Sequence, residues 1–242
     1  MSIQPKIITV GGNQGLPNEQ VHTITNDKFG RLWIAGPLGL SCYNGNTIRN
    51  FDTRDGLKCP GLRTISITKH DIIWIGTDSG IEAMTIDGTI LDLKLNFEWT
   101  FGIADSFLII DTIIWVGTSF GLLKLENKNQ ELNLLFCEDI GLVTNIIYNG
   151  VNSILAISSK KGVVEYTNDS IIKFAEDILL NQKPISLFKT IDSCYLIGTL
   201  NGLFFLNKDR ELKGHYISDS EPSKVTAINS IGNEWVIAMN KT

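Results

Sequence analysis

The chain has 242 residues, of which 43% are hydrophobic and 19% charged, and its net charge is −5 with a pI near 5.2. This composition permits a large buried core, and the acidic balance excludes a sequence-independent nucleic-acid surface, which needs a basic stripe. No apolar run approaches the roughly 18 residues that span a bilayer, and residues 1–6 are too short and polar for a signal peptide. We therefore expect neither a nucleic-acid partner nor membrane contact within this chain.

The first fifty residues predict a series of short strands separated by turns. VHTIT alternates polar and apolar side chains, as a half-buried strand does, and a glycine-bearing turn separates LWIA from LSCY. Asn44-Gly45 is a hairpin signal, because both residues accept the positive φ of a type I′ turn. The predicted strands are 7–10, 21–25, 32–35, 40–43 and 47–51.

The segment LWIAGPLGLSCYN, residues 32–44, recurs along the chain. Its partial copies include WIGTDSGIEAMTI, WVGTSFGLLKL, AISSKKGVVEY and LIGTLNGLFFL, followed by VIAMNKT. The equivalent positions are 33, 74, 115, 156, 196 and 236, which are 40 or 41 residues apart. A fixed period of this length is typical of a repeat architecture, and four short strands per period indicate the blades of a β-propeller.

The predicted fold is therefore all-β: a β-propeller of about six four-stranded antiparallel blades whose last blade is incomplete. We name the strands of each blade A to D in chain order, and we expect a D strand at 89–93 and an A strand at 101–104. The alternative is part of a seven-bladed propeller. Residues 7–10 are a possible closing strand, and an open last blade would invite pairing with another chain. The predicted single domain, 1–242, contains blade-like repeats at about 15–51, 56–93, 97–136, 141–174, 183–217 and 222–242.

Residues 15–51 closely resemble the two-component regulator propeller repeat. The shared pattern is a Gly-Leu-Pro turn, a V-x-x-I strand, D-x-x-G, an L-W-I-G-T strand and G-L-x-x-Y-x-G. Later copies keep the Trp, Gly and Thr elements at 74–77 and 115–118, whereas Ala156 and Leu196 are taken as the residues at the tryptophan position of the fourth and fifth repeats.

This resemblance implies the sensor part of hybrid histidine kinases and related regulators, which often detects oligosaccharides outside the cytoplasm. The usual sensors of this family carry two propellers, a β-sandwich and a membrane span. The resemblance thus implies an extracytoplasmic or periplasmic, bacterial signal-transduction domain. If the chain were the complete gene product, the missing signal peptide would predict a cytoplasmic protein.

No catalytic, cofactor or metal signature is visible. Three histidines (His22, His70 and His215) lie in different parts of the repeat, and the four cysteines form no C-x-x-C motif. We therefore expect no enzyme activity, no cofactor and no metal. A propeller lyase would need a histidine and a carboxylate clustered at one mouth, and no such pair can be named.

Candidate ligand-binding residues are those that interrupt the repeat where D–A and B–C loops converge at the channel mouth. Trp99 and Phe120 could stack on a sugar ring, with Arg63 and Asp78 supplying polar contacts. The alternative is that Trp99 packs between blades and the charged side chains are solvated. His22, Arg63 and Asn145 are expected in the innermost strands, with side chains that face the channel. The full candidate set is His22, Arg54, Arg63, Asp78, Trp99, Phe120, Asn145 and Lys160, with Asp55 and Lys161 beside them.

Two functions follow as hypotheses. The first is a non-enzymatic sensor propeller that binds an oligosaccharide or another small molecule. The second is a protein–protein interaction scaffold, with self-association through the incomplete last blade.

Overall fold

The computed structural model describes residues 9–175, 179, 182–216, 223–231 and 234–241. The chain divides into two compact units, residues 1–94 and 95–242. Each unit is described by itself below. Residues 7 and 8 of the expected closing strand lie outside the described residues, and residues 9 and 10 are not in a strand.

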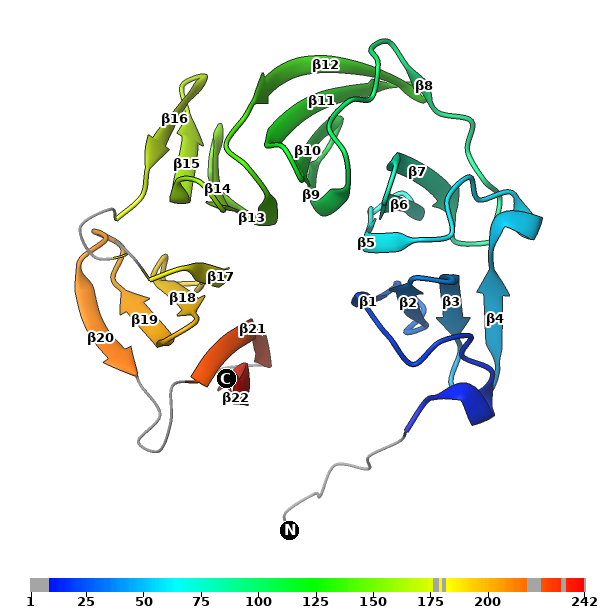
Figure 1. Ribbon diagram of the computed structural model, residues 1–242, viewed down its shortest axis with the longest axis horizontal. Helices are drawn as coiled ribbons and strands as arrows, with labels where there is room; N and C mark the ends of the chain where they lie inside the picture. Colours follow the sequence, from blue (N-terminus) through cyan, green and yellow to red (C-terminus); the bar gives the residue numbers. More distant parts are fainter. Residues whose placement is uncertain (1–8, 176–178, 180–181, 217–222, 232–233, 242) are drawn as a thin grey trace. The chain divides into compact units, whose positions relative to one another are not determined.

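The first unit contains two antiparallel sheets, which we call blades 1 and 2 (Figure 1). Blade 1 consists of β1 (Thr23–Asn26), β2 (Leu32–Gly36), β3 (Gly39–Tyr43) and β4 (Ile48–Phe51), in that order. Blade 2 consists of β5 (Leu62–Ile67), β6 (Ile72–Thr77) and β7 (Gly80–Thr85). Two short 3₁₀ helices, η1 (Gly12–Gln14) and η2 (Thr53–Asp55), precede and follow blade 1.

The strand predicted at 89–93 is not formed, so blade 2 has three strands. Ile90 makes only an isolated bridge to Met84, and the Leu91 N–H donates to the Ala83 carbonyl at 2.8 Å. The Leu93 N–H then donates to the Leu91 carbonyl at 3.1 Å. This tight i→i+2 turn takes the backbone out of the ladder, although the apolar alternation of the segment is that of a strand.

The tryptophan of the first repeat is held by the turn that precedes it. Trp33 is fully buried and stacks on Phe51, with ring centroids 5.8 Å apart. Its Nε1 donates to Asp27 Oδ2 at 2.9 Å, and Arg31 donates to the same carboxylate. Desolvation opposes ionisation of Asp27, but the hydrogen bonds from Trp33 and Arg31 outweigh it and lower the pKa of the carboxyl.

The second unit contains four further sheets, blades 3 to 6, in the described residues. Blade 3 has the order β8 (Lys94–Leu95), β12 (Glu131–Glu138), β11 (Leu122–Lys128), β10 (Ile113–Thr118), β9 (Ala104–Ile110). Blade 4 is β13 (Val143–Gly150), β14 (Ser153–Ser158), β15 (Gly162–Thr167) and β16 (Ser170–Lys173). Blade 5 is β17 (Pro184–Lys189), β18 (Tyr195–Thr199), β19 (Gly202–Leu206) and β20 (Leu212–Tyr216), and blade 6 is β21 (Ser223–Ile231) with β22 (Glu234–Lys241).

The first strand of blade 3 differs from the strand predicted at 101–104. It begins at Ala104 and runs to Ile110. The preceding aromatic residues pack on one another, and the Trp99 and Phe101 rings meet edge to face with centroids 5.6 Å apart. Gly102 has φ 71°, so the backbone turns in the left-handed region just before the strand.

Within the second unit, successive blades present equivalent strands on the same side. Figure 1 shows β13, β17 and β21 along one side of the blades and β16 and β20 along the other. Each blade buries apolar residues against the next, and one such cluster contains Trp115 of β10 together with Val164 and Tyr166 of β15. The prediction of an all-β propeller fold is confirmed, and a count of six blades is compatible with the described sheets. The extent of one domain over 1–242 stays a prediction.

The repeat register in blade 4 corrects the sequence alignment by one residue. Thr118 and Ser158 both stand opposite the first residue of the A strand, next to a β-bulge in that strand. Counting back three residues places Leu155, and not Ala156, at the position of Trp115. Leu155 belongs to the core between blades 4 and 5, whereas Ala156 packs toward blade 3. A one-residue slip reverses the face of every side chain in a strand, which is why this error matters.

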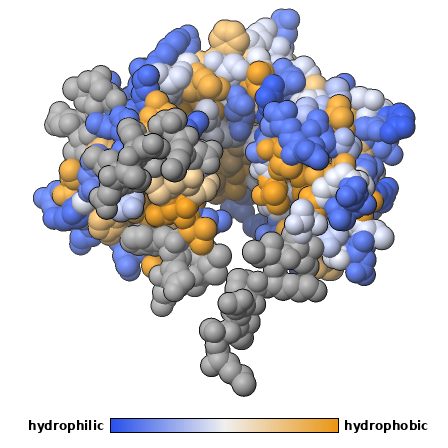
Figure 2. Space-filling view, turned by 60° about the horizontal axis from the view of Figure 1, so that its bottom comes forward, coloured by the Kyte–Doolittle hydropathy of each residue, from blue (hydrophilic) through white to orange (hydrophobic). Residues whose placement is uncertain are grey.

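The visible surface is mostly hydrophilic. Figure 2 shows blue residues over much of the face, with apolar residues scattered among them. Strongly exposed apolar side chains include Val151 (87%) and Ile191 (100%), each in the A–B turn of its blade. Scattered exposures of this kind are normal in soluble domains. No helix in the described part of the chain is long and apolar enough to cross a membrane.

Candidate functional site

The turn between strands B and C is a repeated hydrogen-bonded unit. In three blades the threonine that ends strand B donates its hydroxyl to the carbonyl of the glycine three residues later. These pairs are Thr77–Gly80 at 3.1 Å, Thr118–Gly121 at 3.0 Å and Thr199–Gly202 at 3.0 Å. This hydrogen bond explains why a threonine and a glycine recur at a fixed spacing in the repeat. We therefore assign no ligand site to these two positions.

Blade 4 departs from this turn. Ser158 pairs with Gly162, so three residues lie between them, and two lie between each threonine and its glycine in the other blades. The Ser158 hydroxyl donates to the Ile140 carbonyl at 2.5 Å and accepts the Lys161 N–H at 2.9 Å. Gly162 has φ 75°, as expected for the left-handed residue that ends a three-residue hairpin loop. The longer turn places Lys160 and Lys161 next to each other at its tip.

Adjacent blades are joined at this end by a hydrogen bond to a residue at or near the start of the next A strand. In the second unit the Ser106 hydroxyl donates to the Val143 carbonyl and the Ser186 hydroxyl donates to the Val225 carbonyl, both at 3.2 Å. In the first unit, His22 Nδ1 lies 2.7 Å from the Leu62 carbonyl. Its Nε2 lies 3.2 Å from Gln20 Nε2. The predicted site residue His22 therefore contributes to the interface between blades 1 and 2.

Glycine makes this approach possible. Gly117 stands opposite Ser106, and Gly198 stands opposite Ser186. A Cβ on Gly117 would lie 2.5 Å from the Val143 carbonyl oxygen, and a Cβ on Gly198 would lie 2.6 Å from a Val225 methyl. Neither position has space for a side chain. The Gly–Ser pair thus lets the next blade pack tightly.

The interface between blades 4 and 5 lacks this pair. Asn145 stands at the serine position, and Ile157 stands opposite it at the glycine position. The Oδ1 atom of Asn145 is buried and has no hydrogen-bond partner among the described residues. An isoleucine side chain thus stands where the other two interfaces of the second unit have a glycine.

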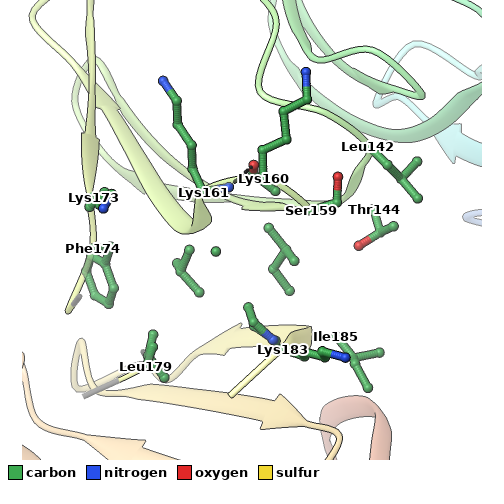
Figure 3. A pocket seen from close by; sticks show the side chains of 15 residues that line it. Leu142, Thr144, Ser159, Lys160, Lys161, Lys173, Phe174, Leu179, Lys183 and Ile185 are labelled. Atoms are coloured by element: carbon green, nitrogen blue, oxygen red, sulfur yellow. Dashed lines mark hydrogen bonds between the residues drawn. The ribbon is translucent and has the colours of Figure 1, made fainter. Parts of the chain in front are cut away.

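A pocket of about 600 Å³ lies between blades 4 and 5 (Figure 3). It lies at the end of the sheets that carries the B–C turn and the D–A segment. In Figure 3, Lys160 and Lys161 lie on one wall and Leu179, Lys183 and Ile185 on the other. The described lining residues are Leu142, Thr144, Ile157, Ser158, Ser159, Lys160, Lys161, Gly162, Val163, Lys173, Phe174, Leu179, Lys183, Pro184 and Ile185.

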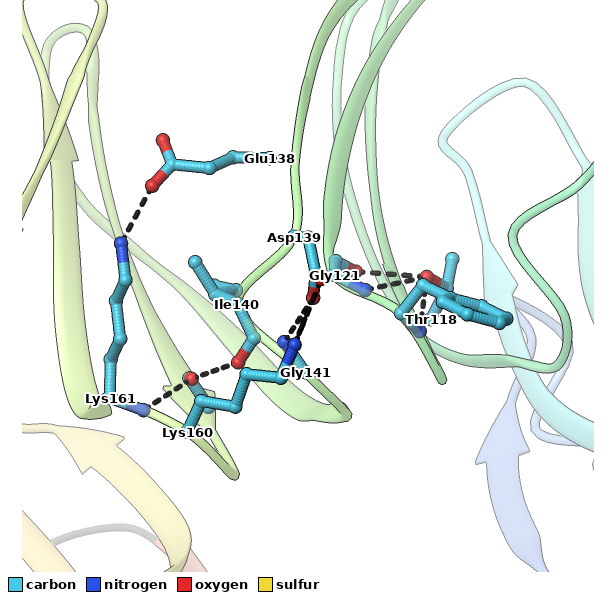
Figure 4. A network of polar contacts seen from close by, with 10 residues as sticks. Thr118, Gly121, Glu138, Asp139, Ile140, Gly141, Lys160 and Lys161 are labelled. Carbon is cyan, nitrogen blue, oxygen red and sulfur yellow. Dashed lines mark hydrogen bonds and ion pairs between the residues drawn. The ribbon is translucent and has the colours of Figure 1, made fainter.

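The lysine head groups of the B–C turn are engaged by acids of the preceding blade (Figure 4). Lys160 Nζ lies 2.7 Å from Asp139 Oδ1, and Lys161 Nζ lies 2.7 Å from Glu138 Oε1. The hydrogen bond from Lys160, joined by that from the Gly141 N–H, lowers the pKa of Asp139. Figure 3 shows both lysine chains extending away from the opposite wall, so their methylene stems border the pocket.

Trp99 and Phe120 are brought together, but not at this pocket. Trp99 Nε1 donates to the Gly102 carbonyl at 2.8 Å. A Cβ on Gly102 would lie 3.3 Å from the Phe120 ring, so that ring packs over the same turn. Trp99 is half-buried against Phe97 and Phe101, whereas Phe120 is 56% exposed. The structure thus gives Trp99 a packing role within its own segment.

The remaining predicted residues lie in the first unit. Arg63 Nε and Asp78 Oδ1 form an ion pair at 2.5 Å, with side chains 36% and 43% exposed. Arg54 is 89% exposed and pairs with Asp52 within the η2 turn. Asp55 accepts the Asp52 N–H in the same turn. No group of three or more potential metal-ligating side chains is found among the residues that the structure describes.

Sequence reasoning found Lys160 and Lys161 but missed the rest of the pocket, and the predicted residue Asn145 is not among the described lining residues. Lys173 and Lys183 flank the D–A segment of blade 4, and Phe174 and Leu179 supply apolar wall. Two local features of the sequence could have indicated the pocket. The B–C turn of blade 4 carries two lysines, and the D–A segment of the same blade interrupts the repeat. The role of these side chains as ligand contacts stays a prediction.

The comparisons with known proteins agree with this fold. The family model described as two component regulator propeller matches residues 15–37, which end in the β2–β3 turn, and this confirms the resemblance found in the sequence. No curated protein sequence matches the chain.

Solved structures match it over nearly its whole length. One, described as the extracellular domain of a hybrid two component system, BT3049 from B. thetaiotaomicron, has a TM-score of 0.79, 17% identity, and coverage of 96% of this chain and 34% of that chain. Another, described as the extracellular domain of a one component system, BT4673 from B. thetaiotaomicron, has a TM-score of 0.79, 15% identity, and coverage of 95% of this chain and 36% of that chain.

A third similar structure is an enzyme, virginiamycin B lyase from Staphylococcus aureus, in a catalytically inactive form with quinupristin. Its TM-score is 0.72, its identity 15%, and the match covers 88% of this chain and 75% of the lyase. At such identities the likeness shows the fold alone. The chain spans about a third of the length of the two extracellular-domain structures it matches. This chain is thus a β-propeller that carries a two-component regulator propeller repeat at its start.

Proposed function

We propose that this chain is a non-enzymatic sensor propeller of two-component-regulator type that binds a glycan or another small molecule between blades 4 and 5. The observation that carries the proposal is the pocket of about 600 Å³ at the end where the B–C turn and the D–A segment meet. Its size falls within the roughly 300–1,000 Å³ of small-molecule sites. The repeat at residues 15–37 and the sensor-system structures of the same fold support the type of domain.

The architecture of the pocket suits a sensor. One wall belongs to blade 4 and includes Thr144, and the other belongs to blade 5 and includes Ile185. A ligand that contacts both walls binds best at one separation of the two blades, and it shifts the population toward that separation. No pair of residues with acid–base geometry is needed for this role.

A ligand screen with a blocked pocket tests the proposal. Neutral and acidic oligosaccharides and small metabolites are screened by thermal shift and by ligand-observed NMR against the wild type, Thr144→Trp and Thr112→Trp. Thr144 is an exposed wall residue, so tryptophan there fills the pocket. Thr112 is an equally exposed threonine in the A–B turn of blade 3, at the other end of the sheets, and serves as the matched control.

A hit that is lost in Thr144→Trp and kept in Thr112→Trp supports the proposal. The absence of hits, or hits indifferent to Thr144→Trp, contradicts it. The same proposal places the domain outside the cytoplasm, as for the extracellular-domain structures that the chain resembles. Fractionation of the native host, probed with an antibody to this chain, checks the compartment, and a purely cytoplasmic signal contradicts that part.

A second candidate function is self-association through blade 6. In the described residues β22 pairs only with β21, so its other edge has no sheet partner there. Unpaired edges are templates for strand addition. Light scattering over a range of concentrations tests this function, and a strictly monomeric chain counts against it.

A further inference from the structure

The two ends of the interface between blades 4 and 5 are held in different ways. At the end that carries the A–B and C–D turns, three side chains of blade 5 bind two residues of blade 4. Arg210 donates to the carboxylate of Glu165 at 2.6 Å. The Tyr195 hydroxyl donates to Asn149 Oδ1 at 2.9 Å, and Lys189 Nζ donates to the Asn149 carbonyl at 2.5 Å. Glu165 is only 5% exposed, and charge-assisted hydrogen bonds away from water are strong and directional, so this end of the interface is fixed.

Ring contacts hold two of these donors in place. The Phe174 ring, which is 1% exposed, meets the Tyr195 ring edge to face with centroids 4.9 Å apart. The guanidinium carbon of Arg210 lies 4.8 Å from the centroid of the same Phe174 ring. Both donors therefore make a second contact that restricts their side chains, and this contact adds to the stiffness of the fixed end.

The opposite end of the same interface contains the pocket of about 600 Å³. Thr144 of blade 4 and Ile185 of blade 5 lie on its two walls. Apolar packing through Leu155 and Leu187 joins the blades in the core beside it. Side chains that face a cavity lack the dispersion contacts of a close-packed interior, so the two blades restrain each other less at the pocket than at Glu165.

We propose that blades 4 and 5 pivot about the Glu165 and Asn149 contacts, so that the width of the pocket changes while the other end of the interface stays fixed. The pivot itself needs no ligand, whereas its use as a sensor rests on the proposed function. Strand β18 runs from Tyr195 at the fixed end to Thr199 at the pocket end, a rise of about 13 Å. A rotation of about 5° about the fixed end therefore moves the pocket end by about 1 Å, which is enough to make or break contacts with a bound molecule.

The neighbouring interfaces determine which blades move together. The Ser106–Val143 hydrogen bond joins blade 3 to blade 4, and the Ser186–Val225 hydrogen bond joins blade 5 to blade 6, both at 3.2 Å and both at the end that carries the pocket. The glycine beside each serine has no space for a side chain. Blades 3 and 4 thus form one body and blades 5 and 6 another. A ligand that sets the width of the pocket also repositions β21 and β22.

Distances between pairs of spin labels test the pivot in the full chain. Double electron–electron resonance is measured with nitroxides attached to genetically encoded p-acetylphenylalanine, so that the four free cysteines stay unchanged. Ser159 and Asn201 report on the pocket end, Val151 and Ile191 on the fixed end, and Phe120 and Ser159 on the closed interface between blades 3 and 4. All of these positions are exposed, and Phe120 and Asn201 occupy the same place in their B–C turns.

The distance distribution of the Ser159–Asn201 pair is expected to be about twofold broader than those of the other two pairs. Thr144→Trp fills the pocket and is expected to narrow this distribution to the width found for Phe120–Ser159, whereas Thr112→Trp leaves it unchanged. Equal widths for all three pairs in the wild type overturn the pivot. A Ser159–Asn201 distribution that Thr144→Trp does not narrow overturns it as well.

A second set of variants tests where the pivot lies. Arg210→Gln removes the charged contact with Glu165 and is expected to broaden the Val151–Ile191 distribution about 1.5-fold. The control is Lys213→Gln, which removes an exposed ion pair within blade 5 and leaves this distribution unchanged. If Arg210→Gln does not fold, Tyr195→Phe removes only the hydroxyl that donates to Asn149 and serves the same purpose. A Val151–Ile191 distribution that stays as narrow as in the wild type shows that these contacts are not the pivot.

The outcomes separate this inference from the proposed function. If the distributions behave as expected and no screened compound binds at the site that Thr144→Trp blocks, the pivot stands and the proposed function fails. If compounds bind there and the three distributions are equally narrow, the proposed function stands and the pivot is overturned.

Discussion

Two neighbouring interfaces of the second unit, one on each side of blade 4, are built differently. Toward blade 3, Tyr166 packs edge to face on Trp115 with ring centroids 4.5 Å apart, and the Ser106–Val143 hydrogen bond holds the B–C end together. Toward blade 5, apolar packing continues through Leu155 and Leu187, but the B–C end opens into the pocket. The propeller repeat therefore specifies tight packing, and a local departure from it creates a cavity.

The departure is confined to a pair of residues that face each other across two strands. Gly117 and Ser106 at the closed interface correspond to Ile157 and Asn145 at the open one. The open interface is secured instead at the opposite end of the sheets. There the buried carboxylate of Glu165 accepts from Asn149, Ser153 and Arg210 at distances of 2.8, 2.7 and 2.6 Å.

The largest expected effect comes from removing the Glu165 carboxylate and the hydrogen bonds that it accepts. Glu165→Ala leaves three donors without their acceptor, one of them the guanidinium of Arg210, and is expected to cost about 3 kcal/mol of unfolding free energy. For a chain of this length that lowers Tm by roughly 6–12 °C. Differential scanning calorimetry measures the shift. The control is Glu211→Gln, which removes an exposed pair with Lys213 and leaves Tm unchanged. A Glu165→Ala chain as stable as the wild type would show that apolar packing alone holds blades 4 and 5 together.

The next effect tests the closed interface. Gly117→Ala places a methyl group against the Val143 carbonyl and is expected to cost about 2 kcal/mol through overpacking. Urea denaturation gives the change in unfolding free energy. The matched control is Gly214→Ala, because that glycine has no atom within 4 Å of its would-be Cβ and no positive φ. Equal effects of the two substitutions would contradict the close approach that we describe at Gly117.

A third substitution moves the open interface toward the closed type. Asn145→Ser removes a buried oxygen that has no hydrogen-bond partner and is expected to stabilise the chain by about 1 kcal/mol. The reverse change, Ser106→Asn, is expected to destabilise it, because Val143 of the next blade packs against this position and leaves no room for a larger side chain. Chemical denaturation of both variants measures the two signs. Destabilisation by Asn145→Ser would indicate that the side-chain amide of Asn145 has a hydrogen-bond partner in solution.

The last effect is a pH dependence of the closed interface. Burial, followed by the hydrogen bond to Asp169, raises the pKa of Tyr166 to about 12 from 10.0. The folded state keeps its proton to higher pH than the unfolded state, so this contribution is complete below pH 10.0 and is lost as the pH rises toward 12.

Urea unfolding of the wild type and Tyr166→Phe at about pH 9 and about pH 11.5 checks this sign. The phenylalanine variant is expected to lose less stability between the two conditions. Tyr195, whose pKa is also raised by burial, accounts for part of the loss that remains. An identical decline in both chains would show that Tyr166 ionises as freely in the folded state as in the unfolded one.

The blade pattern could be predicted from sequence because it depends on interactions between residues that are close together in the chain. Strand alternation, the Asn44-Gly45 hairpin and the Gly-Thr turns depend on residues a few positions apart, and they recur often enough to average out single errors. Two local predictions still failed. Residues 89–93 alternate like a strand but leave the ladder at Leu93, and the aromatic run before Ala104 packs on itself.

The sequence by itself determined that the chain is a blade repeat, that blade 4 carries two lysines in its B–C turn, and that Asn145 lies in the A strand of that blade. Only the tertiary structure decided that Ile157 stands opposite Asn145 at the glycine position, since this depends on a register that one extra turn residue shifts. It also decided that Lys183, some twenty residues further on, faces the same pocket from the next blade. Pockets between blades arise from side chains distant in sequence, and no local pattern specifies their distance.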